Sequence, residues 1–153
     1  MQIRDVTDRD ALIVADLVAE LLTELSGGSE VEPGSLEEVA RTLLKRDDVT
    51  GSLAIDPDGP DPDMPVGIIL LNQCAAIYAG GIFGEITELY IRPDYRSRGV
   101  AARLLSAAEA TGRARGWARL EVGAPSQPAW HRTLAFYQRQ GFLETGPRLR
   151  RLL

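Results

Sequence analysis

The chain has 153 residues, of which 44% are hydrophobic, so it is long enough to bury a core and too apolar to be disordered. Its formal net charge of −5 disfavours nonspecific binding to nucleic acid or to an anionic membrane. It holds one cysteine, no secretory signal and no run of roughly 18 apolar residues that could span a bilayer. We expect a cytoplasmic protein with a single domain over residues 1–153.

Two helices are predicted near the start, after a short strand at residues 2–5. Apolar residues recur at helical spacing from Val14 to Leu25, which indicates a helix with one buried face. Ser35 and Glu38 form an S-x-x-E capping box, which predicts a second helix that reaches about Lys45.

The middle of the chain predicts strands. Residues 53–55 read as one strand, and the continuous apolar run at residues 66–71 reads as an interior strand. The intervening Asp, Pro and Gly residues predict a solvated loop, so the two strands form an antiparallel hairpin. A Gly-Gly pair after Ala79 marks the next turn.

A strand, a basic turn, a helix and a strand follow in that order. The strand covers residues 86–91 and stops before Pro93. The Arg-rich turn contains Gly99, and an Ala/Leu-rich helix then runs toward Gly116. Residues 120–122 read as the next strand.

The last part of the chain predicts a helix near residues 130–140, followed by closing strands at residues 142–143 and 149–153. The coarse order is β-α-α-β-β-β-α-β-α-β-β. This order predicts an α+β fold, in which helices flank a mixed, mostly antiparallel sheet.

The basic turn is a candidate anion site. Its backbone N–H groups precede a helix, where they lack partners and where the helix dipole favours negative charge. Gly99 allows a phosphate to approach the main chain, while Arg96 and Arg98 can add charge-assisted contacts. No G-K-[ST] follows, which excludes a Walker loop. The candidate anion-binding residues are Arg96, Ser97, Arg98, Gly99, Val100, Ala101 and Ala102.

A second motif covers residues 133–142, where a helix that carries Phe136 and Tyr137 leads into Gly141 and Phe142. The Tyr137 phenol is a usable proton donor. The alternative is that both aromatic side chains pack in the core.

Together these segments resemble the GNAT superfamily of N-acetyltransferases. The turn at residues 96–101 is similar to the family's Q/R-x-x-G-x-G/A pyrophosphate loop. Residues 88–93, ELYIRP, are similar to its E-L-x-V-x-P strand, and residues 135–142 are similar to its A-x-x-Y-x-x-x-G-F tract, with the alanine slightly shifted. One departure is Trp130, which stands where many relatives carry an asparagine.

The resemblance implies acetyl-CoA as co-substrate and a central β-α-β unit that binds it. The strands that end at Ile91 and Val122 are then expected to splay apart around the pantetheine. The main chain of Tyr90 and Ile91 would pair with the pantetheine amides, the basic turn would hold the pyrophosphate, and Phe136 would lie beside the cofactor. An N–H at Ile91 can polarise the thioester carbonyl.

The resemblance also implies catalytic roles. A neutral amine is needed as nucleophile, so a base must take its proton and an acid must protonate the leaving thiolate. Glu88 is the candidate base, with Glu85 as the runner-up, and Tyr137 is the candidate acid. With no evident acyl carrier, direct attack in a ternary complex is expected.

The expected partner is a small-molecule or peptide amine, and Glu30 and Glu32 could attract it when it is cationic. No metal is expected, because His131, the only histidine, has no ligand partner at a suitable spacing. A homodimer stays open. Two alternatives are a non-catalytic acyl-CoA-binding sensor module on the same fold and a nucleotide-binding domain with a fully parallel sheet.

Overall fold

The computed structural model describes residues 1–153, which divide into two compact units, Met1–Glu121 and Val122–Leu153. The single domain expected from the sequence therefore stays a prediction. The helices and strands are, in chain order, β1 (Gln2–Asp5), η1 (Asp8–Asp10), α1 (Ala11–Leu25), α2 (Gly34–Leu43), β2 (Val49–Ile55), β3 (Pro65–Ala76), β4 (Gly81–Ile91), η2 (Pro93–Tyr95), α3 (Val100–Ala114), β5 (Leu120–Val122) and α4 (His131–Arg139).

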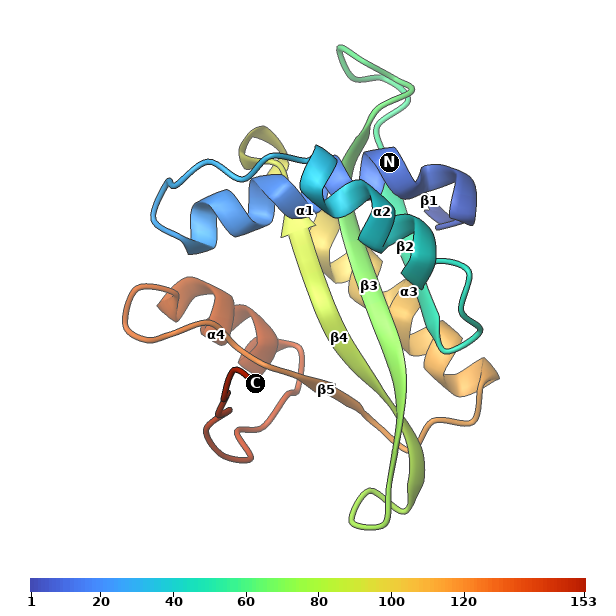
Figure 1. Ribbon diagram of the computed structural model, residues 1–153, viewed down its shortest axis with the longest axis vertical. Coiled ribbons are helices and arrows are strands. Elements are labelled where there is room, and N and C mark those ends of the chain that lie inside the picture. Colours follow the sequence, from blue (N-terminus) through green and yellow to red (C-terminus); the bar gives the residue numbers. More distant parts are fainter. The chain divides into compact units, whose positions relative to one another are not determined.

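The strands form one sheet in the order β1-β2-β3-β4-β5 (Figure 1). β1 to β4 are antiparallel neighbours. Toward β5, Gly84 N–H donates to the Arg119 carbonyl at 3.0 Å and Ala118 N–H to the Ile82 carbonyl at 3.1 Å. These bonds advance in the same direction along both segments, as in a parallel pair joined by a helix. The mixed, mostly antiparallel sheet is confirmed, and a fully parallel nucleotide-binding sheet is excluded.

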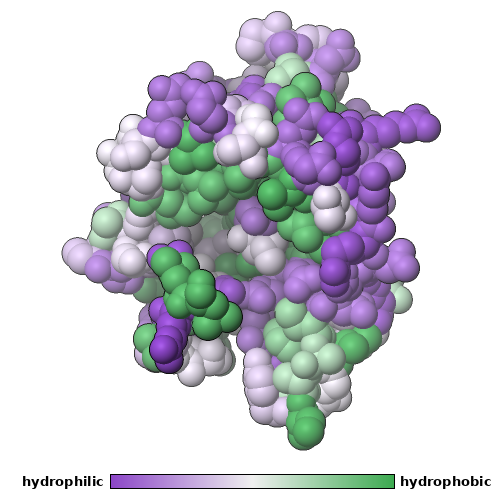
Figure 2. Space-filling view, viewed as in Figure 1, coloured by the Kyte–Doolittle hydropathy of each residue, from purple (hydrophilic) through white to green (hydrophobic).

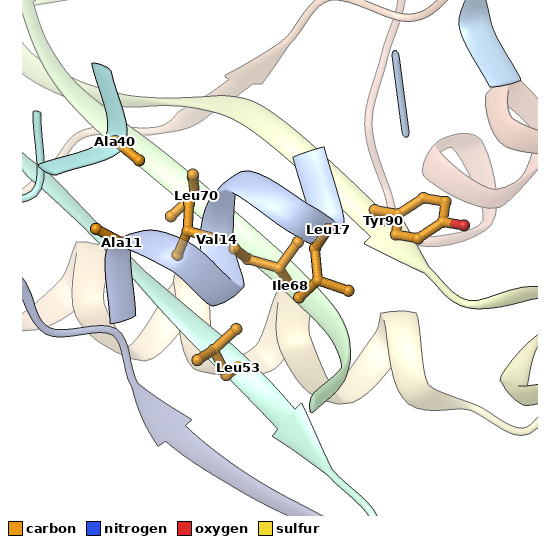
Figure 3. Close-up of a cluster of buried hydrophobic side chains, with 8 residues drawn as sticks. All are labelled: Ala11, Val14, Leu17, Ala40, Leu53, Ile68, Leu70 and Tyr90. Carbon is orange, nitrogen blue, oxygen red and sulfur yellow. The ribbon is translucent and has the colours of Figure 1, made fainter. Parts of the chain in front are cut away.

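α1 and α2 lie on one face of the sheet, where their apolar side chains build a core (Figures 1 and 3). The cluster joins both helices to the three central strands. In Figure 3 the ring of Tyr90 lies at the end of β4, and its hydroxyl points away from the other side chains. The buried members are Ala11, Val14, Leu17, Ala40, Leu53, Ile68, Leu70 and Tyr90.

The predicted start of α2 is wrong. α2 begins at Gly34, so Ser35 is already inside the helix, and its hydroxyl donates to the Glu32 carbonyl at 2.7 Å. No side chain caps this helix. The S-x-x-E pattern therefore does not act as a capping box here.

α3 lies on the opposite face of the sheet, behind β3 in Figure 1, and buries Leu104 and Leu105 completely. Trp117, just after α3, packs so closely on Gly84 that a Cβ there would lie 2.2 Å from the indole ring. Only glycine fits this position. The indole Nε1 donates to the Gln73 side chain at 2.8 Å, which ties the end of this crossover to β3.

The unit Val122–Leu153 contains α4 and no strand of its own beyond the last residue of β5. The closing strands predicted at residues 142–143 and 149–153 are therefore wrong. Phe142 instead packs its ring against Tyr137, with centroids 5.3 Å apart. Gly146 has a φ of 138°, and Pro147 has no N–H to donate, so this stretch does not continue as a ladder.

Hydrophobic residues gather at the bottom of the view in Figure 2, where Figure 1 shows the hairpin between β3 and β4. Ile77 is fully exposed and Tyr78 is 72% exposed in this hairpin. None of the helices has the length and hydropathy that crossing a bilayer requires.

Candidate active site

The first part of the site is the turn at residues 96–102, which we call the amide turn because its N–H groups after Arg96 are unpaired. Ser97 has a φ of 59° and Gly99 a φ of 78°, and α3 starts directly afterwards. The N–H groups of Ser97 to Ala102 have no acceptor within the chain, and the first internal bond runs from Arg103 N–H to the Gly99 carbonyl. Successive N–H groups in such a turn form an anion-binding concavity.

The space at the amide turn is open. Nothing lies within 4 Å of where a Gly99 Cβ would stand. Arg98 stacks its guanidinium on the Tyr95 ring at 5.2 Å and makes no ion pair. Orphaned donors, an unobstructed glycine and a free cation fit the diphosphate of a coenzyme A molecule.

Arg96 was expected to contact a bound phosphate, but its side chain has partners within the chain. Its Nη2 donates to Glu24 Oε1 at 2.6 Å, and its Nε donates to the Ile91 carbonyl at 2.8 Å. Its guanidinium also lies 5.5 Å from the centre of the Tyr90 ring. Arg96 is therefore bound to α1 and to the end of β4.

The second part is the edge of β4 that faces away from β3. Arg92 N–H donates to the Val66 carbonyl at 2.9 Å, so alternation directs the main chain of Tyr90 toward β3 as well. The main-chain groups of Leu89 and Ile91 point to the other edge. The main chain of Tyr90, which we expected to pair with the pantetheine, is therefore engaged with β3. At the outer edge the main chain of Leu89 takes its place.

That edge extends beyond β5. β5 has 3 residues against 11 in β4. Counted from the bond between Gly84 and Arg119, β5 ends level with Thr87. The last residues of β4 therefore lie past the end of their neighbour, and the outward-facing N–H of Ile91 has no partner in β5.

A β-bulge decides where the two candidate bases point. On β3, Leu70 pairs with Glu88 while Leu71 pairs with Ile86, so Thr87 is the extra residue. Glu85 pairs with Asn72, which lies two residues from Leu70 and so on the same face. Glu85 and Glu88 therefore share the face covered by α1 and α2, although a regular strand would separate them.

Burial raises the pKa of Glu88, and the nearby Glu85 carboxylate raises it further, against a lowering hydrogen bond from the Thr87 side chain. Desolvation and a like charge both disfavour the ionised form. Glu88 is thus a better proton acceptor than an exposed glutamate, as a general base requires.

The third part is an open cavity of about 660 Å³ beside the end of β4, which we call the acidic groove. α1, the connection from α1 to α2, and the end of β4 form its walls. Glu20 pairs with Arg92 at 3.1 Å and Glu24 with Arg96 at 2.6 Å, whereas Asp16 and Glu30 have no cationic partner. The lining residues are Asp16, Ala19, Glu20, Thr23, Glu24, Gly28, Glu30, Val31, Pro33, Tyr90 and Arg92.

Of the two glutamates expected to attract a cation, Glu30 lines the groove and Glu32 does not. The sequence analysis missed Asp16, Glu20 and Glu24. Their signal was their spacing of four residues on a predicted helix, which places acidic side chains in one row.

In the second unit, α4 carries Tyr137, whose side chain is only 5% exposed. Its ring contacts those of Phe136 and Phe142, with centroids 5.4 Å and 5.3 Å away. Burial raises the pKa of Tyr137 to about 12, and its hydroxyl has no hydrogen-bond partner in the chain. The phenol therefore keeps its proton throughout the physiological pH range.

The other residues singled out in the sequence have ordinary surroundings. Trp130 precedes the first turn of α4 and is half-buried, and the His131 ring lies 3.3 Å from the Pro128 carbonyl. Burial, followed by Glu85, raises the pKa of Cys74, so its sulfur stays a weakly nucleophilic thiol. No three His, Cys, Asp or Glu side chains gather in an arrangement for a metal.

The sequence also matches a known protein family. Residues 18–142 match the family described as the acetyltransferase (GNAT) family. No curated protein sequence matches the chain.

Solved structures share the fold along nearly the whole chain. A protein of Arthrobacter sp. FB24, proposed to be an acetyltransferase, has a TM-score of 0.79 and 27% identity and covers 100% of this chain and 96% of its own. A ribosomal-protein-alanine N-acetyltransferase from Brucella melitensis biovar Abortus 2308 has a TM-score of 0.74 and 22% identity, and the match covers 99% of this chain and 100% of that one. An aminoglycoside acetyltransferase from an uncultured soil metagenomic sample has a TM-score of 0.75 and 18% identity, and the match covers 99% of this chain and 97% of that one. At such identities the last two establish the fold alone.

Proposed function

Because this chain belongs to the acetyltransferase (GNAT) family and is an acyltransferase, we propose that it moves an acetyl group from acetyl-CoA to an amine by direct attack in a ternary complex. The observation that carries the proposal is the amide turn, whose N–H groups from Ser97 to Ala102 have no acceptor in the chain. It directly follows the strand whose end also borders the acidic groove. A donor site and an acceptor site then meet at the end of β4.

The donor side uses main-chain groups. The amides of residues 97–102 and the Arg98 guanidinium hold the diphosphate, since they supply unpaired donors and positive charge. The outward-facing main-chain groups of Leu89 pair with the pantetheine amides, while the Ile91 N–H polarises the thioester carbonyl and the Ile91 carbonyl keeps its bond from Arg96. Acetyl-CoA bound there supplies an acetyl group on a good leaving thiolate.

The acceptor side attracts a cationic amine and then removes its proton. Asp16 and Glu30 have no cationic partner, so they give the acidic groove a negative potential. Glu88, on the same sheet face as the groove-lining Tyr90, takes the proton directly or through a water. Glu85 is the second candidate, because the bulge at Thr87 puts it on that face too.

Tyr137 completes the proton balance as the donor to the departing thiolate. Its raised pKa, about 12, keeps the phenol protonated before reaction. A covalent acetyl-enzyme is disfavoured, because the raised pKa of Cys74 leaves the only thiol protonated.

The test is release of CoA thiol from acetyl-CoA, measured with a panel of polyamines, amino acids, aminoglycosides and N-terminal peptides. We expect amine-dependent release with at least one cationic amine and only slow release without amine. CoA binding without any release would support the sensor alternative. Failure to bind CoA would remove the proposed function altogether.

A further inference from the structure

Glu24 lies between the amide turn and the acidic groove and is bound to both. Its Oε1 accepts hydrogen bonds from Arg96 Nη2 at 2.6 Å and from the Tyr90 hydroxyl at 3.2 Å. The same side chain lines the groove. One carboxylate thus neutralises a cation of the donor side while it faces the acceptor side.

The guanidinium of Arg96 is occupied by contacts within the chain. Besides Glu24, it contacts the Ile91 carbonyl and the face of the Tyr90 ring. Both ends of the pair are partly solvated, with side-chain exposures of 43% for Arg96 and 29% for Glu24. A partly exposed ion pair has a small net stability, so a stronger partner can replace either member.

We propose that the Arg96–Glu24 ion pair is an exchangeable link that couples the binding of the two substrates, an inference that rests on the proposed function. When the diphosphate occupies the amide turn, it takes Arg96 as a partner. Glu24 then loses its cation and presents an uncompensated charge to the groove. The donor-loaded protein therefore binds a cationic amine more tightly, and by reciprocity the amine favours the donor.

The chain offers a matched control. Glu20 lies one helical turn before Glu24, lines the same groove and pairs with Arg92 at 3.1 Å. Arg92 lies outside the amide turn. Glu20→Gln therefore removes the same charge from the same groove without releasing Arg96.

The experiment is calorimetric titration of CoA, at low salt, into the wild type, Glu24→Gln, Glu20→Gln, Arg96→Ala and the Glu24→Gln/Arg96→Ala double variant. Circular dichroism confirms that each variant is folded. We expect Glu24→Gln to tighten CoA binding by about three- to tenfold, because Arg96 is set free. Glu20→Gln should change it by less than about twofold, and the Glu24 effect should vanish in the Arg96→Ala background.

Three results would overturn the link while leaving the proposed function intact. CoA affinity could be unchanged or weaker in Glu24→Gln, it could rise equally in Glu20→Gln, or the gain could persist without Arg96. The last two would mean a general electrostatic effect of the groove. If the wild type does not bind CoA, the proposed function itself fails.

Steady-state kinetics with the best amine of the panel gives a second readout. The link predicts that Glu24→Gln tightens the donor but raises the KM for the cationic amine, since the groove has lost a charge. A merely structural Glu24 predicts that both substrates bind more weakly, and that result would contradict the link.

Discussion

Thr87 has an influence on the site that its own side chain does not suggest. As the extra residue of the bulge in β4, it shifts the register so that Glu85 and Glu88 point to one face. Burial on this face, and then the charge of Glu85, raise the pKa of Glu88, so a strand residue becomes a usable base.

Glu88→Gln tests this role. A base must be ionised, so kcat/KM should fall as the pH drops through the raised pKa of Glu88. The glutamine variant should have a lower rate, by about 10²-fold or more. The acidic limb of its pH profile, where kcat/KM falls with decreasing pH, should be flattened. Glu85→Gln is the control and should move the limb toward lower pH, since it removes a like charge. An unchanged limb in Glu88→Gln would transfer the role to Glu85 or to solvent.

Tyr137→Phe tests the proton donor. We expect turnover to fall by about 10²- to 10⁴-fold with little change in CoA affinity, because only the hydroxyl is lost. Phe142→Leu, which shortens a ring packed on Tyr137, is a suitable control for packing. Full activity of Tyr137→Phe at every pH would remove the phenol from the mechanism.

Some residue roles could not be read from the sequence. The E-L-x-V-x-P resemblance located β4, but the sequence gives no register. The exchange of Tyr90 for Leu89 at the free edge and the common face of Glu85 and Glu88 both depend on register and on the bulge. The contact of Arg96 with Glu24 joins residues 72 positions apart and has no local signal.

Among the elements, β1 and the start of α1 are joined by one buried carboxylate. Asp10 accepts two hydrogen bonds from Arg4, at 2.9 Å and 2.7 Å, and one from Thr7 N–H at 2.8 Å. The Arg4 hydrogen bond is the largest cause that lowers the pKa of Asp10 to about 2 from 3.8. The ionised form is therefore stabilised in the folded state.

Asp10→Asn should destabilise the protein by about 2 kcal/mol at pH 7. Because the folded pKa is the lower one, the stabilisation is complete above pH 3.8 and disappears as the pH falls toward 2. Urea unfolding of both proteins at a series of pH values measures the difference. Asp8→Asn, an exposed neighbour without an ion pair, should be nearly neutral. A difference that grows with acidity would contradict this account.

Helices and strands with strong periodicity were predictable, and their ends were not. β4 begins at Gly81, five residues before the predicted start, because pairing with β3 overrides the glycines and polar residues at its beginning. The predicted capping box at Ser35 does not form, because the N-cap is Pro33, two residues before Ser35. The closing strands failed because their short apolar segments have no ladder partner.

At the scale of the whole molecule, the order of the motifs was more informative than any one of them. Three short patterns and the order of the elements indicated the family and its mixed sheet, which the family match confirms over residues 18–142. The acidic groove was not predictable in the same way. It forms only when α1 and the connection after it meet the end of β4, which is distant from them in the sequence.

The proposed diphosphate site is best examined by calorimetric titration of CoA into the wild type, Gly99→Glu and Gly116→Glu. Both glycines have a left-handed φ, 78° and 72°, and open space at the Cβ position, so the two substitutions impose similar strain and the same charge. Gly116 follows the far end of α3. We predict that Gly99→Glu weakens CoA binding by more than about 100-fold, while Gly116→Glu changes it by less than about threefold. Unchanged affinity in a folded Gly99→Glu variant would contradict the account, because the diphosphate would then bind elsewhere.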